Sequence, residues 1–183
     1  MNLYDTIASH VNAMKNQMFT SLPAVVLKVY EIEGGTVVDC SLGVRYMTKD
    51  GMITEDAPLM GIPLVWPSAA GCYITFPIEA GDTVMVNFAM RDVSRWVNGD
   101  GGVTDPFTRR LHNPSDAFAT PSMLPYGKAP KVDSEAVKIA STGTEIRILK
   151  DGTIELGKGA TEAIIKGDAF KTWIDAEFTK ILA

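Results

Sequence analysis

The stretch that decides the fold runs Thr144-Glu145-Ile146-Arg147-Ile148 and then Gly152-Thr153-Ile154-Glu155-Leu156. Apolar and polar residues alternate in both segments, so the apolar side chains fall on one face at the strand period of two. Further short runs of this kind lie at Glu135–Ser141 and Glu162–Lys166, and Gly-rich turns separate the runs. Each run is too short to bury its own apolar face. The segment therefore predicts a ladder of strands that needs a neighbour.

Three identical chains could supply that neighbour for one another. If they wind together, all three apolar faces are buried on a common axis and every strand edge is paired. We therefore predict an intertwined, obligately oligomeric β-structure, a stalk, over residues 135–167. Its expected core is Val137, Ile139, Ile146, Ile148, Ile154, Leu156 and Ile164.

Composition limits the possible partners. The 183 residues, 46% of them hydrophobic, suffice for one ordinary domain or for a small domain with an appendage. The net charge is −5, and Lys and Arg do not gather into a stripe, so we expect no nucleic-acid binding. No run is apolar enough to span a bilayer, and the N-terminus does not resemble a secretory signal. Synthesis in a cytoplasm is therefore expected.

The potential metal ligands are few and scattered. Cys40 and Cys72 lack the spacing of a metal knuckle, and we expect two buried thiols that act as small hydrophobic groups. His10 and His112 are far apart, and neither belongs to an HxH or HExxH arrangement. We expect no metal and no cofactor.

A catalytic role finds little support. His112, Ser115 and Asp116 are the residue types of a hydrolytic triad, but they lie close together on one stretch of chain. Triads are usually assembled from separated elements. The carboxylates elsewhere show no context for a general acid and base. The sequence therefore predicts a protein that is not an enzyme, with no catalytic residue.

The first two thirds of the chain begin with a helix and continue with strands. Apolar residues three and four apart predict an amphipathic helix over residues 2–18, within an N-terminal segment 1–20. Residues 21–105 then contain short strand-like runs, at Ala24–Tyr30, Thr36–Leu42, Ile62–Pro67, Cys72–Pro77 and Thr83–Phe88. Five or six such strands, with a hairpin at Glu33-Gly34-Gly35, predict a small Greek-key barrel, with the OB fold as its best match.

The remaining segments are a connector and a second helix. Residues 106–134 contain five prolines and are expected to form an extended strap between barrel and stalk. Residues 168–183 return to a helical pattern, with Asp168 as a possible cap. The side chains expected to pack around this terminal helix are Phe170, Trp173, Ile174 and Phe178. The predicted fold class is thus mainly β, with a helix at each end.

Two stretches carry a family resemblance. Phe76–Trp96 contains GD, an apolar strand, F, two residues, RD, three residues and W, and Arg110–Ala117 follows as RLHNPSDA. With LVWP at 64–67, this order resembles the N-terminal domain of phage central spike proteins, the membrane-puncturing baseplate components of contractile-tailed bacteriophages. The resemblance covers roughly residues 22–124. It implies a homotrimer on the tail axis, with an OB-fold domain above a triple-stranded β-helix.

The resemblance also implies a function. A spike of this kind is a structural part of the virion, made in the host cytoplasm, that caps the tail tube and contacts or pierces the host envelope on contraction. Its partners are the baseplate hub or tail tube proteins and, in some cases, a separate tip protein. Many such spikes end in an apex where a histidine pair from each chain binds iron. No HxH occurs here, so the iron site is not expected, and the tip is separate, blunt or missing from a shortened chain.

The candidate contacts to a neighbouring subunit or to the hub are Arg91, Asp92, Trp96, Arg109, His112 and Asp116. The main alternative function is an OB-fold module that binds nucleic acid or an oligosaccharide. That module would need a basic groove with exposed aromatic side chains. The chain offers Tyr46, Trp66 and Tyr73, but its overall charge is acidic.

Overall fold

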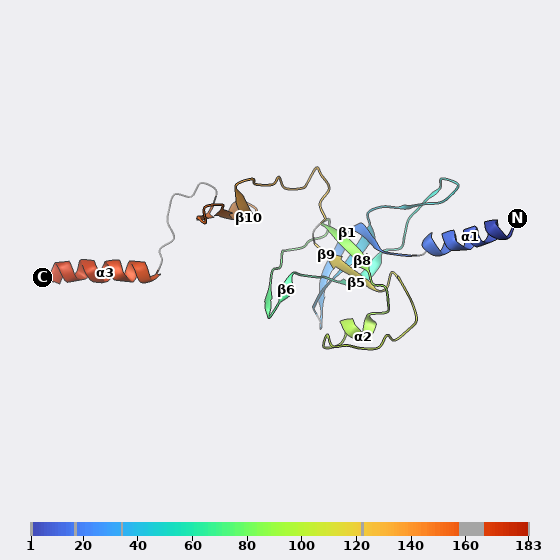
Figure 1. Ribbon diagram of the computed structural model, residues 1–183, viewed down its shortest axis with the longest axis horizontal. Coiled ribbons are helices and arrows are strands. Elements are labelled where there is room, and N and C mark those ends of the chain that lie inside the picture. Colours follow the sequence, from blue (N-terminus) through green and yellow to red (C-terminus); the bar gives the residue numbers. More distant parts are fainter. Residues whose placement is uncertain (1, 17, 34, 122, 158–166, 183) are drawn as a thin grey trace. The chain divides into compact units, whose positions relative to one another are not determined.

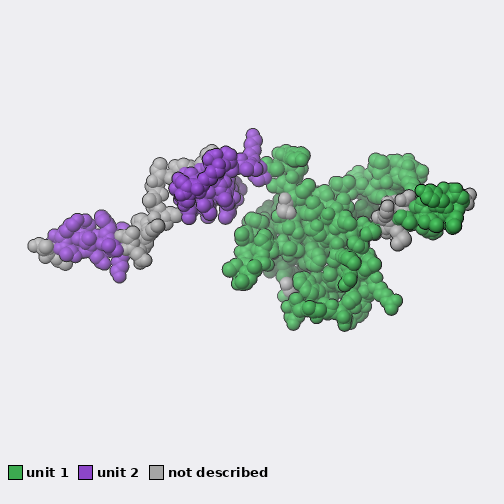
Figure 2. Space-filling view, in the orientation of Figure 1, with its two compact units in different colours: residues 1–129 green, residues 130–183 purple. Residues whose placement is uncertain are grey.

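The computed structural model describes residues 2–16, 18–33, 35–121, 123–157 and 167–182. The chain divides into two compact units, residues 1–129 and 130–183 (Figure 2). The described residues are mainly β-structure with short helices, as the sequence predicts (Figure 1). The first helix, α1 (Leu3–Asn16), lies where the apolar spacing of residues 2–18 predicts it.

A five-stranded antiparallel sheet forms the body of the first unit. Its spatial order is β5 (Leu59–Pro63), β2 (Gly35–Leu42), β1 (Ser21–Ile32), β8 (Thr83–Phe88) and β9 (Ala117–Thr120). The sheet curls into a half-barrel (Figure 1), and a parallel bridge between Leu64 and Ala119 links its two edges. At that point the Val65 N–H donates to the Ala119 carbonyl at 2.8 Å. The predicted hairpin of the first two strands is confirmed.

The core lies inside this curled sheet. Alternating residues of its strands point inward, and the buried set is Ala24, Val26, Val38, Cys40, Leu59, Ile62, Val84, Val86, Phe88, Ala117 and Ala119. The Phe19 ring packs on Phe88 at 5.1 Å between centroids. A bulge at Leu27 interrupts the pairing of β1 with β2 and changes which side chains point inward. As a result Val29, rather than Lys28, packs against the core.

A second irregularity joins β2 to β5. The register of this pair shifts between Val38 and Cys40, and Gly61 on β5 has a φ of +65°. The Gly61 N–H donates to Asp39 Oδ1 at 2.9 Å, and the Tyr30 hydroxyl donates to the same oxygen at 3.0 Å. Asp39 is buried, and these donors stabilise its carboxylate.

The predicted strand at Cys72–Pro77 is wrong in most of its length. Only Cys72–Tyr73 (β7) is paired, with Ser68–Ala69 (β6), across a turn at Ala70-Gly71 with positive φ angles. The rest of the run, residues 74–77, forms no described strand, and the Ile74 N–H donates to the Pro67 carbonyl at 3.1 Å. Cys72 is exposed, which corrects the expectation of two buried thiols, whereas Cys40 is buried.

Two further short elements lie beside the main sheet. Tyr46–Met47 (β3) pairs with Ile53–Thr54 (β4), and Ser94–Val97 (α2) forms one helical turn. Within the stretch 106–134, which was predicted to be an extended strap, β9 pairs with β8 and contributes two alanines to the core. Small residues on a four-residue strand give a weak apolar pattern, so the prolines around them dominate the sequence signal.

The second unit begins with a three-stranded antiparallel sheet. β10 (Ala136–Ser141), β11 (Thr144–Leu149) and β12 (Ile154–Leu156) pair in chain order. Three of the predicted runs are thus strands, and they pair within one chain. The fourth run, Glu162–Lys166, with the predicted core residue Ile164, lies outside the described residues. The helix α3 (Gly167–Leu182) follows.

Candidate functional site

An ion cluster lies at the edge of the half-barrel. Arg110 Nη2 donates to Asp92 Oδ1 at 3.0 Å and to Asp116 Oδ1 at 2.8 Å, and its Nε donates to Asp116 Oδ2 at 2.5 Å. The side chains of Asp92 and Asp116 are 0% and 1% exposed, and that of Arg110 is 30% exposed. We call these three residues the Arg110 clamp.

Neighbouring backbone and hydroxyl groups satisfy the remaining carboxylate oxygens. Ser94 donates its N–H and its hydroxyl to Asp92 Oδ1, and Thr108 donates both groups to Asp92 Oδ2 at 2.7 Å. The Val93 N–H donates to Asp116 Oδ1 at 3.0 Å. The hydroxyls of Ser94 and Thr108 hold the pKa of Asp92 far below its usual range, and Arg110 lowers the pKa of Asp116. Both carboxylates are therefore charged at neutral pH.

The Arg110 clamp holds both ends of the long loop at residues 93–109. This loop carries exposed side chains. Phe107 is 69% exposed, and the Arg95 guanidinium lies over its ring at 5.2 Å from the centroid. Arg91, Arg95 and Arg109 are exposed and form no ion pair with any described residue. We call Arg95 with Phe107 the Arg95 finger.

The predicted contact residues divide into two groups. Asp92 and Asp116 are buried in the clamp, where Asp92 pairs with Arg110 rather than with its neighbour Arg91. Arg91, Trp96 and Arg109 lie on the surface. The Trp96 Nε1–H donates to the Gly101 carbonyl of the same loop at 3.1 Å.

His112 occupies an unusual backbone position. Its φ is +47°, its N–H donates to the Met90 carbonyl at 3.3 Å, and its Nδ1 lies 3.1 Å from the Phe19 carbonyl. No hydrogen bond joins His112 to Ser115 or Asp116 within the described part of the chain. The triad geometry that nucleophilic catalysis requires is therefore not formed by these three described side chains.

Sequence reasoning missed Arg110 as the centre of this site. The signal was present, because two carboxylates in an apolar context need a counter-charge. Arg110 starts the RLHNPSDA motif, six residues before Asp116, yet its spacing from Asp92 gave no local pattern.

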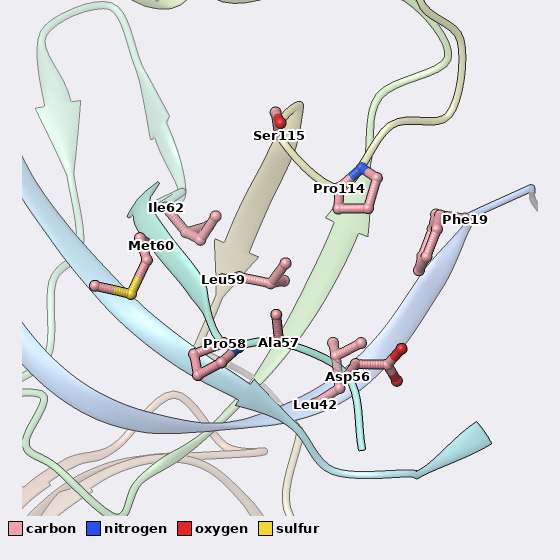
Figure 3. Close-up of a pocket in the computed structure, with 10 residues that line it drawn as sticks. All are labelled: Phe19, Leu42, Asp56, Ala57, Pro58, Leu59, Met60, Ile62, Pro114 and Ser115. Atoms are coloured by element: carbon pink, nitrogen blue, oxygen red, sulfur yellow. The ribbon is translucent and has the colours of Figure 1, made fainter. Parts of the chain in front are cut away.

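A recess opens beside the clamp on the same unit. Its volume is about 400 Å³, and it is lined by Phe19, Leu42, Asp56, Ala57, Pro58, Leu59, Met60, Ile62, Pro114 and Ser115. Asp56 is the one charged side chain among these lining residues (Figure 3). We call this feature the Asp56 recess.

The three-stranded sheet of the second unit exposes its apolar face. Val137 pairs with Ile148 and Ile148 with Ile154, while Ile139 pairs with Ile146 and Ile146 with Leu156. These six side chains form two rows of three and are between 42% and 66% exposed. They are the described members of the predicted stalk core, and we call them the stalk face.

The opposite face of this sheet carries charges. Arg147, 12% exposed, pairs with Asp133 at 2.9 Å and with Glu155 at 2.5 Å, and Lys138 pairs with Glu145. The Asp133 and Glu155 carboxylates raise the pKa of Arg147. The charged side chains of this sheet are thus less exposed than its aliphatic side chains. In a sheet with one face in water, the polar face is normally the exposed one, so the pattern here is reversed.

The terminal helix also exposes aromatic side chains. Phe170 and Trp173 stack with ring centroids 5.9 Å apart, and both are exposed, as is Phe178. Ile174 is half-buried. Across the described chain, no helix is long and apolar enough to cross a membrane. The described residues also contain no group of three or more His, Cys, Asp or Glu side chains arranged to hold a metal ion.

The sequence of the first unit matches a known protein family. The family model described as the phage protein Gp138 N-terminal domain matches residues 22–122, more than half of the chain. The chain belongs to this family. Apart from Ser21, the first residue of β1, the matched range contains all five strands of the half-barrel and the whole Arg110 clamp. No curated protein matches the chain.

Membership in the Gp138 family makes the chain a phage protein with a structural role. It also indicates a component of the virion. The stalk face and α3 lie beyond the matched residues, so the family alone does not explain them.

Proposed function

We propose that this protein is the trimeric central spike of a phage tail baseplate. In this function the half-barrel is an OB-type barrel that seats on the baseplate hub or closes the tail tube. The order β5-β2-β1-β8-β9 and the parallel bridge between the edge strands support this fold, since an OB fold is a five-stranded, partly open Greek-key barrel. Membership in a phage structural family supports the same function.

The observation that carries the proposal is the stalk face. Six aliphatic side chains in two regular rows form an exposed patch of a kind that usually marks an interaction site. Three copies related by a threefold axis would turn these faces toward one another and bury them as the core of a triple-stranded β-helix. The ion pairs of Arg147 would then face outward.

The proposed mechanism is mechanical. Sheath contraction would drive the tube and spike against the host envelope. A stalk in which the outer strands β10 and β12 pair with neighbouring chains would resist shear, because many hydrogen bonds must break together. The terminal helices, with Phe170, Trp173 and Phe178, would pack around the same axis or meet a separate tip protein. This function needs no catalytic residue and no cofactor.

Static light scattering of the full chain tests the assembly. We expect a mass three times that of one chain at micromolar concentration, unchanged on dilution and in mild denaturant. A monomer under these conditions would contradict the spike. Gold-labelled antibodies against the protein test its location, and we expect label at the distal end of the tail in electron micrographs of virions.

A further inference from the structure

The Arg95 finger presents two binding groups from a fixed base. Its aromatic ring is 69% exposed, and its guanidinium has no ion-pair partner among the described residues. Thr108, which follows Phe107, donates two hydrogen bonds to Asp92, and Ser94, which precedes Arg95, donates two more. The finger is therefore held in place before any partner arrives, which lowers the entropy cost of binding.

The Asp56 recess offers the matching groups. Its walls are mostly aliphatic side chains and prolines, with the Phe19 ring beside them, and Asp56 supplies a carboxylate (Figure 3). Asp56 is exposed and forms no ion pair in the described structure. An aromatic ring with a guanidinium stacked on it fits an apolar recess that carries one carboxylate.

The distribution of charge along the chain favours a second copy of the chain over a polyanion as the partner of the finger. Residues 91–110 carry four arginines and three carboxylates, whereas residues 1–90 carry nine carboxylates and only four lysine or arginine side chains. A polyanion would be repelled by the acidic part of the barrel, because affinity for phosphates depends on clustered positive charge. A second copy of the same chain supplies the acidic surface that the finger lacks.

The symmetry of a trimer also favours a contact between the finger of one copy and the recess of another. A threefold ring needs a head-to-tail interface, in which each copy contributes two different surfaces. The finger and the recess are two such surfaces on one compact unit. The finger is exposed and carries a guanidinium without an ion pair among the described residues, and the recess is hollow and carries one carboxylate.

We propose that the Arg95 finger of one copy inserts into the Asp56 recess of the next. The Phe107 ring lies against the apolar wall and the Arg95 guanidinium meets the Asp56 carboxylate, so that three contacts close a ring of barrels. This inference rests on the proposed trimer and adds a second contact to it, independent of the stalk face.

The Arg110 clamp holds residues next to both the finger and the recess. Arg110 fixes the base of the finger through Asp92, and it also holds Asp116, which directly follows the recess residues Pro114 and Ser115. Each copy therefore presents finger and recess in a fixed relation.

A photocross-link in the full chain tests the contact. Phe107 is replaced by p-benzoylphenylalanine, which keeps an aromatic ring at the tip, and the purified protein is irradiated. We expect covalent dimers and trimers on a denaturing gel, with residue 107 joined to a peptide that contains residues 56–62. The same replacement at Tyr126, a still more exposed aromatic residue outside the finger, is the control and should give no product at 56–62.

The outcomes separate the two proposals. A trimer by light scattering that gives no interchain product, or a product elsewhere on the chain, overturns the finger contact and leaves the spike intact. A monomer overturns both. A charge exchange checks the pairing: Asp56→Arg should abolish the product, and Asp56→Arg with Arg95→Glu should restore it. Equal yield in all these variants would contradict the ion pair.

Discussion

Arg110 contacts Asp116 at two points, Nε to Oδ2 at 2.5 Å and Nη2 to Oδ1 at 2.8 Å, while Asp116 also accepts the Val93 N–H. The Val93 N–H and the contact of Arg110 with Asp92 join the start of the long loop to this pair at its end. Because Asp116 adjoins β9, the loop is tied directly to the sheet. Its position is thus set by the core of the barrel.

Removal of the Asp116 carboxylate should loosen this junction. Asp116→Ala leaves Arg110 without its two-point partner and Val93 without an acceptor, so we expect a loss of about 2 kcal/mol in the free energy of unfolding. Chemical denaturation followed by tryptophan fluorescence measures it. Asp105→Ala, an exposed change on the same loop, is the control, with an expected effect below about 0.5 kcal/mol. Equal losses in both variants would contradict a special role for the clamp.

The clamp should also make stability depend on acid pH. The pKa values of Asp92 and Asp116 are lower in the folded protein than in the unfolded chain, so the unfolded state binds more protons as the pH falls. Their contribution is fully present above about pH 4, the pKa of a free Asp, and is lost as pH falls through the folded values. Thermal unfolding from pH 7 to pH 2.5 measures this loss. Asp92→Asn should show a shallower decline, and parallel curves would count against the assignment.

The stalk face should control assembly. Ile146→Asp with Ile148→Asp places two charges in the centre of both rows, where burial of an unpaired carboxylate is costly. We expect trimers to become monomers in light scattering, while the circular dichroism of the half-barrel persists. Val132→Asp, at an exposed position outside the sheet, makes the same chemical change and should leave the trimer unaffected. Trimers in all variants would show that this face is not the interface.

The bulge at Gly61 gives a test within the core. Asp39→Ala removes the acceptor of both the Gly61 N–H and the Tyr30 hydroxyl, and the unpaired N–H should cost about 1–3 kcal/mol. Tyr30→Phe removes one hydroxyl and leaves the N–H paired, so its effect on the denaturation midpoint should be smaller. The opposite ranking would mean that the hydroxyl, and not the backbone group, is the main partner of Asp39.

The strands with long, regular alternation were predictable from the sequence. Thr36–Leu42, Thr83–Phe88 and the runs around Ile146 carry their pattern locally, and each forms a strand. Cys72–Pro77 has equal strand propensity, but pairing depends on which edges are free, and no local pattern reports that. β9 was missed because its inward residues are alanines.

The candidate site shows the same limit. The RD and SDA motifs identified Asp92 and Asp116, but the direction of their side chains depends on Arg110, which reaches both from another part of the loop. A sequence pattern finds charged residues that lie near each other along the chain. It does not find a guanidinium that serves two carboxylates in space.

Because the sheet of the second unit exposes its aliphatic face, contacts made by that face should depend on the salt in solution. Aliphatic contacts strengthen in sulfate or phosphate, because these salts are excluded from apolar surface. A partly exposed guanidinium–carboxylate contact weakens as the Debye length shrinks, to about 3 Å at 1 M salt. The stalk face and the ion pair of the Arg95 finger should therefore respond to salt in opposite directions. In the proposed trimer, the contacts between stalk faces would thus outlast the ion pairs between barrels in concentrated sulfate.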